Sequence, residues 1–171
     1  MLGCVLAAAA DEGWNPAAAA AYLDQRQEAW FGWAPAKSQG GPCLSCHTGL
    51  PYLLARPRLR AALGQKEPGR FETGLLDGLR ARLAKPMGEG TRAEQAAGVE
   101  SVFAALLLTR AEGWSADAQK AFDRLWARQV REGPQRGAWA WYVFATDPYE
   151  TADSVYFGAA LAGLAVEAAP A

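Results

Sequence analysis

Two cysteines and a histidine within five residues carry the most specific chemistry in this sequence. Residues 43–47 read Cys-Leu-Ser-Cys-His, the C-x-x-C-H pattern through which c-type haem is attached. Each thiol can add across a porphyrin vinyl group to form a thioether, and a neutral imidazole suits iron. His47 is the only histidine, and Cys43 and Cys46 are two of the three cysteines. The motif therefore predicts one covalent haem, held by Cys43 and Cys46, with His47 as proximal iron ligand.

Two other uses of these side chains stay open. A C-x-x-C pair can form a dithiol or a disulfide, although a thioredoxin-like pair follows a β-strand and residues 37–42 read as a loop. A structural zinc ion needs four nitrogen or sulfur ligands. Cys43, Cys46 and His47 supply three of them, so zinc would require Cys4 as the fourth.

The other side of the iron has one candidate ligand in the sequence. Met87 lies in a Lys-Pro-Met-Gly turn downstream of the motif. This order, with the histidine first and a methionine in a later loop, resembles small class I cytochromes c. The alternative is that Met87 only packs in its loop. The iron would then be five-coordinate, or bound by water, by lysine or by a group from a missing part of the protein.

Basic and aromatic side chains offer further contacts to a haem. Arg56, Arg58 and Arg60 follow the motif closely, and a guanidinium pairs well with a carboxylate such as a haem propionate. A solvated basic face is the other reading of these three arginines. An aromatic set can form haem walls or simply helix core; it consists of Trp30, Trp33, Trp139, Trp141, Tyr142 and Tyr149.

The composition favours packed helices. Hydrophobic residues make up 51% of the chain, alanine is abundant and β-branched residues are few. The formal charge is −1, with acidic and basic residues interspersed, which argues against a nucleic-acid partner. No apolar stretch reaches the roughly 20 residues of a membrane helix. We therefore expect a mainly α protein with no membrane span.

Residues 1–10 read as the remnant of an export signal. They are apolar, and three alanines before Asp11 fit an A-x-A cleavage site, although the positive n-region is missing. A lipid anchor at Cys4 and an ordinary alanine-rich helix start are the alternatives. Because haem c is normally attached on the periplasmic side, we expect an exported or periplasmic protein. Residues 11–171 are then expected to form a single haem-binding helical domain.

Apolar residues recur at helical spacing along most of the chain. The predicted helices cover residues 16–31, 51–63, 68–85, a segment that starts with a T-x-x-E capping box at 91–94 and ends at Gly113, a segment capped by Ser115, and 155–166. Residues 138–144 look strand-like, and we expect an extended segment laid against helices. Gly158 and Gly163 predict that the last helix closely approaches another helix.

The residues around the motif carry a family resemblance. Residues 43–52 read C-L-S-C-H-T-G-L-P-Y and residues 55–57 read A-R-P. They resemble bacterial exported proteins that couple a C-x-x-C-H-T-x-L-P haem motif to helix repeats similar to the toroids of squalene–hopene cyclases and prenyltransferases. Segments 100–107, 137–141, 148–150 and 156–159 fit the same pattern. The resemblance implies helix pairs of an α/α toroid, of which this chain supplies a part, with a haem-bearing loop similar to a cytochrome c domain.

The resemblance does not extend to cyclase chemistry. The chain has neither a D-x-D-D nor a D-D-x-x-D motif, and fold analogy alone does not transfer a function. The first hypothesis is a periplasmic cytochrome domain that exchanges single electrons with redox partners the sequence does not identify. The alternatives are a haem enzyme or gas sensor with an open distal site, and a haem that serves as a structural staple of the toroid. A carrier is favoured over a catalyst, since no acid–base pair is evident.

Overall fold

The computed structural model describes residues 13–38, 41–85, 88–144 and 150–170, and it confirms a mainly helical protein. Its α-helices are α1 (Pro16–Gly32), α2 (Gly49–Ala62), α3 (Arg70–Leu83), α4 (Thr91–Glu112), α5 (Ala116–Ala127) and α6 (Val155–Glu167). The described elements also include two 3-10 turns and one antiparallel hairpin whose strands have two residues each. The turns are η1 (Ala34–Ala36) and η2 (Ala152–Ser154), and the strands are β1 (Lys37–Ser38) and β2 (Gly41–Pro42).

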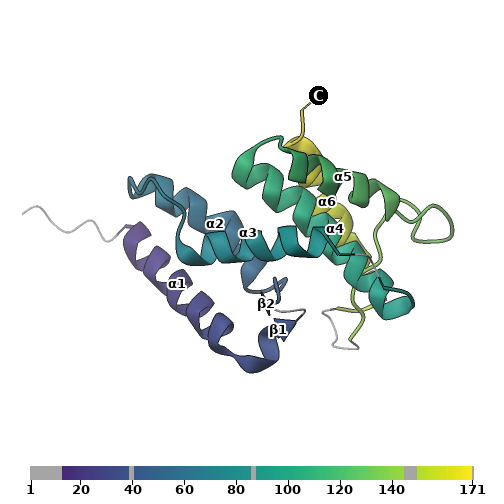
Figure 1. Cartoon of the computed structure of the whole chain (residues 1–171), viewed down its shortest axis with the longest axis horizontal. Helices are drawn as coiled ribbons and strands as arrows, with labels where there is room; N and C mark the ends of the chain where they lie inside the picture. Colours follow the sequence, from purple (N-terminus) through teal and green to yellow (C-terminus); the bar gives the residue numbers. More distant parts are fainter. Residues whose placement is uncertain (1–12, 39–40, 86–87, 145–149, 171) are drawn as a thin grey trace, which may run out of the picture.

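Helix α4 is the centre of the fold. It packs against α3, α5 and α6, while α1 and α2 pair with each other at the other end of the molecule (Figure 1). Residues 102–108 of α4 are at most 2% exposed, and a helix that is apolar on all sides is stable only when neighbours surround it. Along the described part of the chain, no helix combines the length and apolar character needed to cross a bilayer.

Local signals set several helix ends. The Asn15 side chain accepts a hydrogen bond from the Ala18 N–H (3.0 Å), and Ser115 does the same for Ala118 (3.2 Å). Gly113 ends α4 with a φ of 73°, which a glycine adopts without steric cost. The predicted capping box is wrong, because Gly90 is the N-cap and Thr91 is already the first helical residue.

The expected extended segment is present, and it forms part of the core. Trp139 and Trp141 are buried, and the Trp139 indole donates a hydrogen bond to the Leu125 carbonyl (2.7 Å). A Cβ on Gly158 would lie 2.5 Å from the Trp141 ring, so the close approach predicted at Gly158 is to this indole and not to a helix. Helix α6 does pack closely on α4, but Gly163 takes no part in this contact, because a Cβ there would have no atom within 4 Å.

Candidate functional site

The loop that carries the C-x-x-C-H motif is tied to the end of α1. The Cys43 N–H donates to the Ala36 carbonyl (2.8 Å), and the Cys43 carbonyl accepts from the Trp30 indole (2.8 Å) and from the Ser45 N–H (3.0 Å). Leu44 is buried and packs on Gly49, where a Cβ would lie 2.9 Å from its Cδ1. These contacts fix the start of the motif where the chain turns into α2.

His47 lies just before α2 and points outward. Its backbone N–H donates to the Ser45 hydroxyl (3.1 Å), while 67% of its side chain is exposed. Its Nε2 lies 3.8 Å from Oε1 of Glu150, a residue from the far end of the chain. The Thr48 hydroxyl beside it is buried and makes no hydrogen bond to the described residues. The imidazole of His47, including Nε2, therefore lies at the surface and is not packed into the core.

The Cys46 thiol lies in a low-polarity setting. Burial, reinforced by the negative charges of Glu150 and Cys43, raises the pKa of Cys46 to about 12. A redox-active dithiol needs a thiol whose pKa lies below the ordinary value, so that the reactive thiolate forms at neutral pH. The environment of Cys46 has the opposite effect, which disfavours a thioredoxin-like use of the pair.

Two cavities adjoin the motif, and both are bordered by Cys46 and Glu150. The first has a volume of about 420 Å³ and the second about 350 Å³, both within the range of small-molecule sites, roughly 300–1,000 Å³. The first is also lined by His47, Trp141, Thr151, Asp153, Ser154, Tyr156 and Phe157. The second is also lined by Trp30, Pro35, Ala36, Cys43, Leu44, Ser45, Leu79, Arg82, Val99, Glu100, Phe103, Tyr142 and Phe144.

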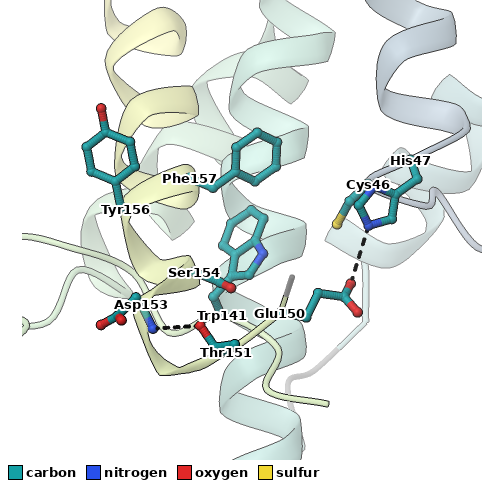
Figure 2. Close-up of a pocket in the computed structure, with 9 residues that line it drawn as sticks. All are labelled: Cys46, His47, Trp141, Glu150, Thr151, Asp153, Ser154, Tyr156 and Phe157. Atoms are coloured by element: carbon teal, nitrogen blue, oxygen red, sulfur yellow. Dashed lines mark hydrogen bonds and ion pairs between the residues drawn. The ribbon is translucent and has the colours of Figure 1, made fainter. Parts of the chain in front are cut away.

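Figure 2 shows how the first cavity is built. Cys46 and His47 project from the start of α2, and Glu150 reaches toward His47 from the opposite side. Trp141 and Phe157 lie across from the motif, with their rings edge to face at 5.7 Å and 88°. The cavity thus has Cys46 and His47 on one wall and an aromatic surface on the other.

The second cavity combines aromatic walls with one arginine, Arg82, and a second arginine, Arg92, stacks on two of its aromatic residues. The Arg92 guanidinium lies 4.3 Å from the Tyr142 ring centre and 4.1 Å from that of Phe144. Arg82 is buried, donates to the Pro42 carbonyl (3.1 Å) and approaches Glu100 (3.6 Å). Burial raises the pKa of Glu100, and burial also raises the pKa of Tyr142 to about 12.

The three arginines predicted as propionate partners border neither cavity. Arg56 is buried and donates two hydrogen bonds to Asp24, at 3.0 and 3.1 Å. Arg60 donates to Glu72 (3.1 Å), and Arg58 is exposed. Arg58 and Arg60 line a separate cavity between α2, α3 and α4. The structure therefore brings Cys43, Cys46 and His47 together and leaves these arginines away from them.

Other predicted residues divide between the site and the rest of the fold. Trp30, Trp141 and Tyr142 line the cavities, Trp139 lies in the core, and Trp33 is 54% exposed. Met87, Tyr149 and Cys4 lie outside the described residues.

The sequence reasoning missed three functional candidates, namely Glu150, Arg82 and Arg92. Of these, only Glu150 was indicated by the sequence, because it ends the segment 148–150 that carries part of the family resemblance. All three are far from the motif along the chain, and folding alone brings them near it.

Within the ranges that the structure describes, no group of three or more His, Cys, Asp and Glu side chains is placed to hold a metal ion. A haem iron takes only one or two protein ligands besides its porphyrin. No family model matches this sequence, and no curated protein and no solved structure matches it either.

Proposed function

We propose that this chain is a c-type cytochrome domain that binds one haem and transfers single electrons in the periplasm. Cys43 and Cys46 would hold the haem through thioethers, and His47 would bind its iron. The observation that carries the proposal is that Cys46 and His47 line one cavity with aromatic walls, while Cys43 and Cys46 line a second. Haem attachment outside the cytoplasm is the reason for the proposed location.

The residues around the motif fit a haem. Aromatic side chains on both cavities supply the apolar, water-excluding surface that a flat porphyrin needs. Arg82 lines the second cavity, and Arg92 stacks on Tyr142 and Phe144, which also line it; either guanidinium suits a propionate carboxylate. When bound, a haem supplies one-electron exchange between ferric and ferrous iron. The protein itself would hold the haem, exclude water from it and set the polarity of its surroundings.

The packing of consecutive helices supports a toroid-like unit. Helix α1 packs on α2, α3 on α4, and α4 on α5, which is how repeated helix pairs bury their faces. Tyr156, Leu164 and Val166 of α6 are exposed apolar side chains that further repeats would cover. We propose that the domain is one part of such an assembly, with the haem loop inserted between helices.

One observation favours a haem enzyme or gas sensor as the second candidate function. The side chain of His47 is 67% exposed and borders the 420 Å³ cavity, so a small molecule has room to reach the iron. Carbon monoxide added to the reduced protein separates the two functions. Rapid and complete binding supports the open site, and little binding together with reversible reduction supports the carrier.

Covalent attachment is tested on the full chain secreted by a bacterium that has cytochrome c maturation proteins. Mass spectrometry and the pyridine haemochrome spectrum should show one haem in the wild type. Cys43→Ser and Cys46→Ser should each lose one thioether, and the double variant should lose covalent haem.

Cys4→Ser is the matched control, because Cys4 is the cysteine outside the motif. It should keep a full haem content. A wild-type protein recovered only as bare polypeptide from this host rules out the proposed function. Circular dichroism of the double variant tests the structural alternative, since a haem staple predicts a loss of helicity.

A further inference from the structure

The carboxylate of Glu150 faces the imidazole of His47 across a short gap. Its Oε1 lies 3.8 Å from Nε2 of His47, which is too long for a hydrogen bond. Bonds from a metal ion to an imidazole nitrogen and to a carboxylate oxygen are each about 2 Å, so two such ligands on opposite sides of one ion are about 4 Å apart. The two side chains are therefore separated by the distance that a shared metal ion requires.

The backbone at Glu150 is held in an unfavourable conformation. Its φ is 52°, and it is the non-glycine residue with a left-handed φ among those the structure describes. An ion pair with the largely exposed side chain of His47 is too weak to offset such a conformation. Non-glycine residues in this region persist where surrounding contacts impose them, often at functional sites. At Glu150 the Phe144 N–H donates to its carbonyl (2.8 Å), and the next residue, Thr151, caps η2.

Open space adjoins the pair. Cys46 and Glu150 border both cavities, and His47 borders the first. The described residues of the two linings include no methionine, no lysine and no second histidine. In Figure 2, Glu150 points at His47, whereas Tyr156 points away from it.

From these observations we infer that Glu150 is the second axial ligand of the haem iron, opposite His47. The inference rests on the proposed function and adds the identity of the ligand. A carboxylate is a hard, anionic oxygen donor, which stabilises ferric over ferrous iron. The ferric protein should therefore be high-spin with a low reduction potential.

The test uses the secreted haem protein and five variants. Glu150→Gln and Glu150→Ala should change the ferric absorption and electron paramagnetic resonance spectra and raise the reduction potential. Glu150→His should give a gain of signal, namely the low-spin spectrum of two imidazoles on one iron. Met87→Ala tests the competing ligand, and Glu94→Gln removes an exposed carboxylate of α4 as the matched control; neither should change the spectra.

The outcomes separate the two proposals. Covalent haem with unchanged spectra in all three Glu150 variants overturns the ligand assignment and leaves the cytochrome proposal intact. A ferric spectrum that changes in Met87→Ala alone overturns the assignment in favour of the methionine. A wild type without covalent haem overturns both. Because Glu150→His gains a signal, poor haem uptake in the other two variants does not decide the result.

Discussion

Replacing Arg56 by methionine tests whether this arginine belongs to the fold or to the haem site. The guanidinium joins α2 to α1 through two hydrogen bonds to Asp24, and its Nη1 lies 3.9 Å from Glu72 of α3. The side chain of Arg56 is 8% exposed and that of Glu72 is 2% exposed. Methionine keeps much of the apolar stem of arginine, so the variant removes chiefly the charge and its hydrogen bonds.

The expected loss follows from which charges remain buried. Breaking a buried ion pair by removing one partner costs about 3–5 kcal/mol. Asp24 is 37% exposed and can be hydrated again, and Glu72 keeps its hydrogen bond to Arg60. We therefore expect Arg56→Met to lower the free energy of unfolding by about 2–3 kcal/mol, below the full cost of a buried pair.

The assay is urea unfolding of the haem-free full chain, followed by circular dichroism. Arg58→Met is the control, since Arg58 lies on the same helix but is exposed, and it should change the stability by no more than about 0.5 kcal/mol. A propionate partner would matter only when haem is bound. Equal stabilities of the two haem-free variants would refute the assignment of Arg56 to the fold.

Three further results are expected. Tyr142 should ionise near pH 12, as a late step in absorbance at 295 nm that Tyr142→Phe removes, and a single step near pH 10 would contradict this. Its pKa of about 12 in the folded protein lies above the ordinary value of 10.0. The stability that depends on Tyr142 is therefore intact below pH 10 and falls as the pH rises from 10 toward 12. Gly158→Ala should destabilise the protein by about 1–3 kcal/mol, because the added Cβ meets the buried Trp141 ring. Gly163→Ala is the control and should be neutral or stabilising. Equal melting temperatures of the two variants would argue against this packing. In a haem-free variant whose only cysteine is Cys46, burial, the largest cause of the raised pKa, remains. Alkylation at pH 8 should then be at least about a hundredfold slower than for a thiol with the ordinary pKa of 9.0, and a rapid reaction would show that the thiol is not buried.

Interactions between residues close in sequence could be predicted, and interactions between distant residues could not. Asn15, Gly113 and Ser115 act within one helical turn, so their capping roles follow from the sequence. Thr91 shows the limit of such patterns, because T-x-x-E fits a capping box but the preceding Gly90 takes the cap position.

The same distinction applies to the site. Cys43, Cys46 and His47 lie within five consecutive residues, so the motif can be recognised without a structure. The partner of Arg56 is Asp24 in a different helix, and Glu150 comes from a segment that reaches the motif only after the chain has folded around α4. Spacing alone does not show whether an arginine meets a carboxylate of the protein or one of a cofactor.

The two walls of the first cavity have different origins in the chain. Cys46 and His47 depend on local contacts between α1, the hairpin and α2, including the bond from the Trp30 indole to the Cys43 carbonyl. Trp141, Glu150 and Phe157 arrive from the C-terminal end. A fragment that stopped after α4 would keep every side chain of the C-x-x-C-H motif but would offer a porphyrin only one side of its enclosure.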